Sequence, residues 1–264
     1  MILKDGELIA GDTIRLIDNT YGGKPLEPDG EGVAYADEFY YVIGSHGNPR
    51  ARAHKLRPKK DAARIRARIL ASSQIVRISA GQTDGARVIQ RTVKLGDVIA
   101  AEPALSPFAG KRLENNGLTI EGVAVSGGRL FAGFRGPVLE NDRAAVLSVS
   151  LDSLFGNQRS DPFLFRLPLG QGQGVRDLAS FDEGIPILAG PSADGPGPYA
   201  VHWWDANSDR VRLLTDLAEV TGKKGKRKAE ALLPLERSPS GLRVLILFDG
   251  EQEGAPSPVT MSAP

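Results

Sequence analysis

One hairpin motif recurs along the chain, and it constrains the fold more than any other feature. Its clearest copy is Leu118 to Val138, LTIEGVAVSGGRLFAGFRGPV, where two apolar runs flank the pair Gly127-Gly128. Two apolar runs joined by Gly-Gly predict two antiparallel strands with a tight turn. Weaker copies occupy residues 29–47, 174–192 and 228–250. The sequence therefore predicts an all-β protein built from repeated hairpins.

An acidic residue stands at the start of each copy. These residues are Glu31, Glu121, Asp177 and Glu230, which are separated by 90, 56 and 53 positions. A repeat of about 50 residues is typical of four-stranded propeller blades. The longest step leaves room for one short basic helical insertion. We therefore expect a β-propeller-like repeat of about four to six four-stranded blades. The simpler alternative is chance similarity, because any all-β chain contains several strand–turn–strand segments.

The length of 264 residues fits one all-β domain. We expect its units near residues 20–100, 115–170, 172–220 and 225–254. Residues 5–18 are predicted to form strand, but they have no inner hairpin of their own. We expect them to supply the outer strand of the last blade, because closing the ring in this way removes exposed strand edges. The alternative is an N-terminus that is incomplete, with one or two blades missing. The tail, residues 251–264, is rich in Pro, Ser and Ala and is expected to fray.

Composition limits the partners and the chemistry. The net charge of +1 gives no reason to expect nucleic acid or an anionic membrane as partner. The chain has no cysteine and no run of 18 apolar residues, which excludes disulfides, thiolate chemistry and a membrane-spanning helix. Because no signal peptide opens the sequence, we expect a cytoplasmic monomer, or a periplasmic one if the N-terminus is incomplete.

The segment from Arg50 to Leu70 is rich in lysine and arginine. Pro58 near its start and the spacing of Ile65 and Ile69 predict a helix over residues 58–70. Such a segment can bind anions or nucleic acid, or it can be a solvated surface helix. No aromatic residues alternate with its charges, which favours the solvated helix.

Antiparallel pairing brings the first residue of one strand beside the last residue of the next. The hairpin therefore places Glu121 beside Arg135. By the same logic Glu31 lies beside His46, and Glu230 beside Asp249. Hairpins arranged about an axis would gather the four acidic residues in one ring, which is our candidate site.

Four carboxylates in a ring need compensation, because two of them about 5 Å apart repel by roughly 3 kcal/mol at an effective dielectric of 20. One solution is a bound Ca²⁺, which prefers oxygen ligands; the metal candidates are then Glu31, Glu121, Asp177 and Glu230. The other solutions are internal ion pairs with Arg135, Arg176 and Lys228, or protonation. Zinc is not expected from three histidines and no cysteine.

His46 is the histidine that lies inside a motif. At a strand end on an acidic face it is a candidate general base or phosphate ligand, although such a histidine can simply hydrogen-bond a loop. If the arginines are available to a ligand, a small anion would be held by Arg135, Arg176, His46, Lys228 and Asp249.

The motifs together resemble a known family. NNGLTIEGVAV and GGRLFAGFRGPV, with YYVIGSHG, GVRDLA, ILAGPS, KAEALL and FDG, are similar to the bacterial family of unknown function DUF3616. The likeness covers most of the chain from Asp29 to Gly254. It implies a β-propeller related to phytase-like esterase domains and other calcium-associated propellers, and so it implies fold more than activity.

Three functions remain open on these residues. The first is a propeller that binds a small anionic or cation-bridged ligand on the face where its inner strands begin. The second is a calcium-assisted esterase or phosphatase with His46 as the base. The third is an interaction scaffold without a small-molecule site.

Overall fold

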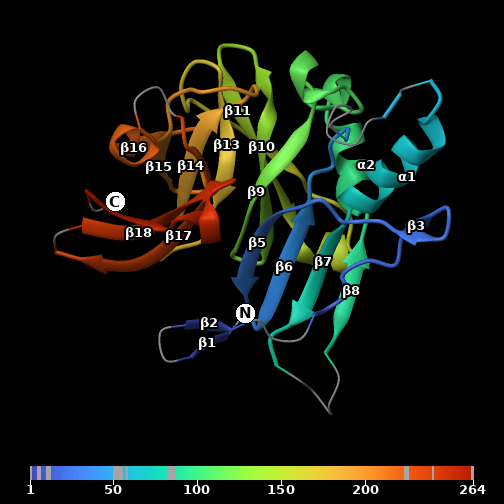
Figure 1. Ribbon diagram of the computed structural model, residues 1–264, viewed down its shortest axis with the longest axis horizontal. Helices are drawn as coiled ribbons and strands as arrows, with labels where there is room; N and C mark the ends of the chain where they lie inside the picture. Colours follow the sequence, from blue (N-terminus) through green and yellow to red (C-terminus); the bar gives the residue numbers. More distant parts are fainter. Residues whose placement is uncertain are drawn as a thin grey trace.

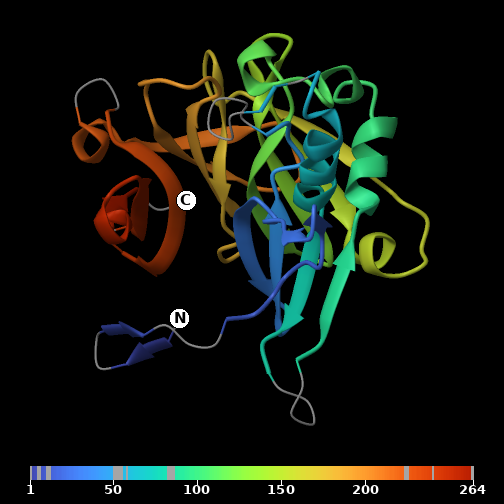
Figure 2. The same cartoon turned by 45° about the vertical axis from the view of Figure 1, so that its right-hand side comes forward.

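Figures 1 and 2 show a fold built almost entirely from antiparallel strands. This computed structural model describes residues 13–49, 56–57, 59–81, 87–222, 226–239 and 241–262, together with the backbone of residues 2–4 and 7–9. Three sheets of four strands and one sheet of three strands follow one another in chain order. The predicted all-β class is therefore confirmed.

Each sheet takes its strands in sequence, from the inside of the molecule outwards. The first sheet holds β5 (Gly30–Ala36), β6 (Phe39–Gly44), β7 (Ile75–Ser79) and β8 (Ile89–Thr92). The second holds β9 (Thr119–Ser126), β10 (Arg129–Leu139), β11 (Arg143–Ser150) and β12 (Phe163–Leu167). The third holds β13 (Gln173–Leu178), β14 (Ile185–Pro191), β15 (Ala200–Trp204) and β16 (Val211–Asp216). The fourth holds β17 (Lys228–Ser238), β18 (Gly241–Asp249) and β19 (Ser257–Met261).

The remaining elements are short. Two small hairpins precede the first sheet, β1 (Ile2–Lys4) with β2 (Glu7–Ile9) and β3 (Thr20–Tyr21) with β4 (Lys24–Pro25). The helices are α1 (Ala62–Ser72), α2 (Lys94–Ala101), α3 (Leu151–Phe155) and α4 (Ala218–Thr221), with 3-10 turns η1 (Ser106–Phe108), η2 (Leu113–Asn115) and η3 (Gln252–Gly254). Of these helices, the sequence predicted α1.

The leading hairpin forms as predicted. Gly127 and Gly128 turn the chain between β9 and β10 with φ of 56° and 72°. Both values lie in the left-handed region, which glycine adopts without the steric cost that a side chain brings. Arg129 therefore pairs with Ser126, and the register set by this turn holds as far as the pair of Gly133 with Gly122.

The core consists of layers between consecutive sheets. Val123 and Val125 on one face of β9 pack in the cluster shared with the first sheet, whereas Ala124 on the other face packs in the cluster shared with the third. A third cluster joins the third and fourth sheets through residues such as Val201 and Leu232. Because the middle sheets are buried on both faces, strands such as β14 (IPILAGP) are apolar at nearly every position.

Glycines allow the inner strands to approach each other closely. A Cβ atom on Gly32 of β5 would lie 2.9 Å from the Val123 side chain, and one on Gly122 of β9 would lie 2.9 Å from the backbone nitrogen of Leu178. A Cβ on Gly174 of β13 would overlap the carbonyl oxygen of Arg135. These motif glycines are therefore needed for packing between sheets.

The series of sheets is open in the part of the chain that the structure describes, where no strand ladder joins the fourth sheet to the first. The expected closure through residues 5–18 is wrong, because β2 pairs with β1 while β19 occupies the position beside β18. The first and fourth sheets, at the two ends of the series, each expose apolar side chains to solvent. Val33 is 63% exposed on the first sheet, and Leu233 is 52% exposed on the fourth.

The tail expected to fray instead supplies β19. Ser257–Met261 pairs with Leu242–Ile246 of β18, and Met261 is buried in the cluster between the third and fourth sheets. Alternation explains this, because Val259 and Met261 are the apolar positions of a strand that also contains Pro and Ser. The prediction of a frayed tail relied on composition and therefore missed this alternation.

The basic segment contributes helix α1, which starts at Ala62 rather than at residue 58; residues 50–55 and 58 lie outside the described part. The C-terminal end of α1 is anchored, since Ala71 is buried with Val76 and Ile17 on the outer face of the first sheet. Most side chains of the helix are exposed or half-buried. Across the described residues, every helix is too short or too polar to cross a membrane.

Removing β19 should destabilise the fourth sheet. A chain ending at residue 256 would lose the β18–β19 ladder and expose the edge of β18, which promotes association. We expect a lower melting temperature and increased light scattering on heating, compared with a chain that ends at residue 262. Equal melting curves for the two truncations would contradict a structural role for β19.

Candidate functional site

Each of the four inner strands contains one extra residue near its start, a β-bulge. Gly30 and Gly32 pair with the neighbouring residues Gly44 and Ile43, which leaves Glu31 unpaired between them. In the same way Glu121 lies between Ile120 and Gly122, whose partners Phe134 and Gly133 are adjacent. A bulge re-aims the side chain of its extra residue. Glu31 and Glu121 thereby both line the central pocket.

The third and fourth inner strands repeat this feature. Glu230 is the extra residue of β17, between Ala229 and Ala231. In β13 the extra residue is Arg176, between Val175 and Asp177. The structurally equivalent positions are therefore Glu31, Glu121, Arg176 and Glu230. The expected ring of four acids was wrong at its third member, because the acidic residue follows the bulge by one position.

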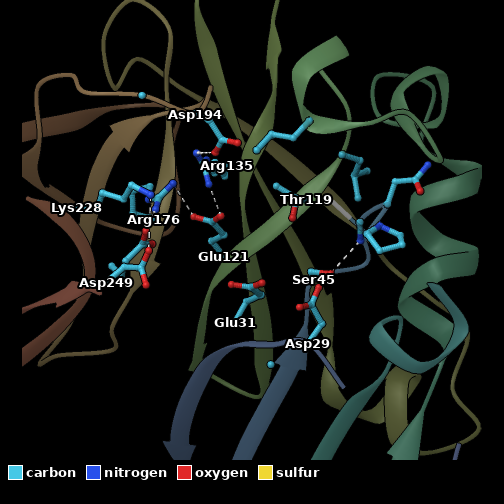
Figure 3. A pocket seen from close by; sticks show the side chains of 18 of the residues that line it. Asp29, Glu31, Ser45, Thr119, Glu121, Arg135, Arg176, Asp194, Lys228 and Asp249 are labelled. Carbon is cyan, nitrogen blue, oxygen red and sulfur yellow. Dashed lines mark hydrogen bonds and ion pairs between the residues drawn. The ribbon is translucent and has the colours of Figure 1, made fainter. Parts of the chain in front are cut away.

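These side chains line a central pocket of about 540 Å³ (Figure 3). Its walls come from all four sheets and from the loops that precede β9 and follow β14. Among the described residues, six carboxylates line it, from Asp29, Glu31, Glu121, Asp194, Glu230 and Asp249. Three basic side chains of the described residues accompany them, from Arg135, Arg176 and Lys228. The described lining is therefore acidic overall.

Arg135 joins the second sheet to the loop that follows β14. Its Nη1 donates to Glu121 Oε1 at 2.9 Å, and its Nη2 donates to Ala193 O at 3.0 Å and to Asp194 Oδ1 at 2.9 Å. Its Nε donates to Ser192 O at 3.0 Å. Burial alone would lower the pKa of Arg135, but the neighbouring carboxylates, Glu121 first, raise that pKa above its ordinary value. The predicted contact with Glu121 is thus present.

Arg176 continues this cluster into the fourth sheet. Its Nη1 lies 3.0 Å from Glu121 Oε2, and its Nη2 pairs with Glu230. The first contact is an ion pair without hydrogen-bond alignment, since Glu121 Oε2 and Arg176 Nε both lack a hydrogen-bond partner among the described residues. Burial raises the pKa of Glu230 against the lowering effect of Arg176, and the nearby Glu121 raises it further.

Asp177 lies outside the pocket and connects the last two sheets. Its Oδ2 accepts from the backbone N–H of Leu232 in β17 at 2.8 Å, and its Oδ1 accepts from its neighbour Leu178 at 2.8 Å. Burial raises the pKa of Asp177 to about 7, against the lowering effect of these two donors. Asp177 is therefore a link between sheets rather than the expected metal ligand.

His46 does not line the pocket, so its expected place on the acidic face is wrong. The residue is buried, its φ is 52°, and its Nδ1 hydrogen-bonds Gly44 O at 2.8 Å. Burial lowers the pKa of His46 to about 4, so the ring is neutral at physiological pH. The register also separates it from Glu31, because β6 ends at Gly44. The loop hydrogen-bonding alternative therefore describes His46.

Of the remaining candidates, Lys228 and Asp249 pair with each other at 3.7 Å, and both side chains are exposed. The four proposed metal ligands do not come together as a cation site: across the described residues, no group of three or more acidic or histidine side chains could hold a metal ion. Glu121 and Glu230 instead make the internal ion pairs that were the second possibility.

Three pocket residues were missed from the sequence. Asp194 is the second carboxylate partner of Arg135, and it comes from the Gly- and Pro-rich loop after β14. Asp29 and Ser45 face each other on the first sheet, where Ser45 Oγ donates to Asp29 Oδ2 at 2.7 Å (Figure 3). The signal for all three was their position in a loop at the end of a strand: Asp29 precedes β5, Ser45 follows β6, and Asp194 follows β14.

Comparison with protein families now supports the likeness seen in the motifs. The family described as "Protein of unknown function (DUF3616)" matches residues 10–74 and 70–257. The chain belongs to this family. A comparison with curated proteins finds no match. The DUF3616 match spans all four inner strands, and so it includes both the bulges and the central ion-pair cluster of this family member.

Arg135 should be a structural residue of this DUF3616 protein. Arg135→Ala leaves buried Glu121 with Arg176 as its one remaining cation among the described residues, and we expect a loss of about 3 kcal/mol in the free energy of unfolding. The measurement is urea denaturation. Arg129→Ala is the control, because this arginine on the same strand pairs with Asp161 near the surface and should contribute less. A larger effect at Arg129 would contradict the assignment.

Asp177 should make stability depend on pH. Because its pKa is near 4 when unfolded and about 7 when folded, its stabilising contribution is complete below pH 4 and is lost as pH rises towards 7. The wild type should therefore lose stability relative to Asp177→Asn over this range by more than about 1.4 kcal/mol, the equivalent of one pKa unit. Denaturation of both proteins at pH 4, 5.5 and 7.5 tests this. A constant difference would show that the carboxyl group has no shifted pKa.

Proposed function

We propose that this protein is a ligand-binding β-propeller whose central pocket takes a small polar molecule carrying positive charge. In this proposal the four sheets are consecutive blades, arranged as the likeness to phytase-like esterase domains implies. The support is the succession of antiparallel sheets packed face to face, with their inner strands around one pocket. A volume of about 540 Å³ suits a small molecule.

The observation that carries the proposal is the charge of the lining, where six carboxylates face three basic groups among the residues that the structure describes. The guanidinium of Arg135 is fully engaged, with donors from all three of its nitrogens in use. Arg176 is held between Glu121 and Glu230, and Lys228 lies beside Asp249. A bare anion would therefore meet excess negative charge, contrary to the first expectation from the sequence.

A cationic group has suitable partners in the pocket lining. Glu31, Asp29 and Asp249 line the pocket, and their oxygens can accept from an ammonium group or from hydroxyl groups (Figure 3). One ammonium 4 Å from one carboxylate gains about 4 kcal/mol at an effective dielectric of 20. Anions could enter only together with a cation, which is the cation-bridged ligand considered from the sequence.

The esterase alternative has less support. It needs a base beside the substrate and a cluster of oxygen ligands for calcium. His46 is buried outside the pocket, and the described residues provide no group of three metal ligands. Binding without chemistry therefore fits the site better.

The ligand class can be tested by thermal shift and calorimetry with four probes: putrescine, glucose, inorganic phosphate, and phosphate with calcium. We expect putrescine to raise the melting temperature, and higher salt to reduce this effect. Glu31→Gln and Asp249→Asn should each weaken putrescine by about threefold to fivefold, the effect of one partly solvated ion pair.

The control for this experiment is Asp37→Asn, at the opposite end of the β5–β6 hairpin, where Asp37 has a φ of 48° that asparagine also adopts. It removes the same charge and should leave binding unchanged. Stabilisation by phosphate alone, with none by putrescine, would overturn the proposed charge preference.

A further inference from the structure

A second and larger cavity lies on the outside of the molecule, away from the central pocket. Its volume is about 1050 Å³, and it is formed between the segment after α2 and the rims of the second and third sheets. The two sites share no lining residue. We refer to this cavity as the outer groove.

The apolar part of the outer groove is unusually poor in hydrogen-bond donors. Pro103, Pro107 and Pro168 contribute rings and no backbone N–H. Phe108 and Leu139 add apolar surface beside them. This part of the groove offers contact area to a hydrocarbon or aromatic body, and little to a polar one.

Three arginines line the same groove, namely Arg143, Arg166 and Arg210. Arg143 and Arg166 lie on one face of the second sheet, because Arg143 is two residues from Ala145 and Arg166 pairs with Ala145. No hydrogen bond or ion pair joins any of the three guanidinium groups to another described residue. They differ in this from the arginines of the central pocket.

The acidic residues of the groove do not neutralise these arginines. One of the two, Asp209, accepts from the backbone N–H of Arg166 at 2.9 Å and so holds the turn before β16 against β12. The other, Glu140, makes no ion pair within the described chain. A guanidinium without a partner is suited to bind a carboxylate or phosphate through paired hydrogen bonds.

We propose that the outer groove binds a small organic anion with an apolar body, that is, an alkyl or aryl carboxylate or phosphate. The anionic head lies at Arg166 and Arg210, and the apolar body lies along Phe108 and the prolines. The site is separate from the central pocket and does not depend on the function proposed for it.

The test is calorimetric titration of the full chain with octyl phosphate, kept below its micelle concentration. We expect saturable binding, with an affinity that falls by about fourfold for each methylene removed on going to shorter alkyl phosphates. Inorganic phosphate should bind much more weakly, and octylammonium should not bind. Equal binding of octylammonium would overturn the proposal, because it would reveal an apolar surface without charge selection.

Arginine variants locate the site. Arg166→Gln and Arg210→Gln should each weaken octyl phosphate by about tenfold, since each removes a charge-assisted contact. Arg64→Gln on α1 removes the same charge elsewhere and should have no effect, and Glu31→Gln in the central pocket should also have none. Because Arg166 and Arg210 are exposed, all variants should keep the wild-type melting temperature. Unchanged affinity in the two groove variants would refute the site.

Discussion

The centre of the molecule depends on one buried carboxylate. Glu121 is held between two arginines from different sheets, Arg135 of the second and Arg176 of the third. Each arginine in turn reaches further, Arg135 to the loop after β14 and Arg176 to Glu230 of the fourth sheet. Charges buried this deeply are tolerated only when each has opposite partners. The cluster therefore fixes how three sheets meet.

The bulges of the inner strands make this cluster possible. In a regular strand, successive side chains point to opposite faces and into the layers between sheets. The extra residue interrupts that alternation, so that Glu121, Arg176 and Glu230 meet one another at the pocket while their neighbours stay in the core. Gly122, the residue after the bulge of β9, keeps the backbones close enough for Arg176 to reach Glu121.

Much of this arrangement was predictable from the sequence, where local rules decide the geometry. The Gly127-Gly128 turn fixed the register of the leading hairpin as far as Gly133, which brought Glu121 and Arg135 to the same end of the hairpin. The all-β class followed from the same repeats.

The wrong predictions concern places where a single inserted residue or a single distant contact decides which way a side chain points. A bulge leaves no signature in composition, so Asp177 was placed in the ring and Arg176 was predicted only as an ion-pair partner or anion ligand beside it. The burial of His46 depends on Ser72, whose carbonyl oxygen accepts its backbone N–H from a segment far along the chain. The strand β19 was hidden by its Pro and Ser content, although its alternation is regular.

The distribution of arginines explains why a net charge of +1 is a poor guide to what the protein binds. In the central pocket, Arg135 and Arg176 form ion pairs with carboxylates, and their positive charge is therefore not available to a ligand. In the outer groove, Arg166 and Arg210 have no such partners among the described residues. Opposite charges are thus separated between two cavities of one chain. The availability of a charge, rather than its presence in the sequence, decides which ligand each cavity can accept.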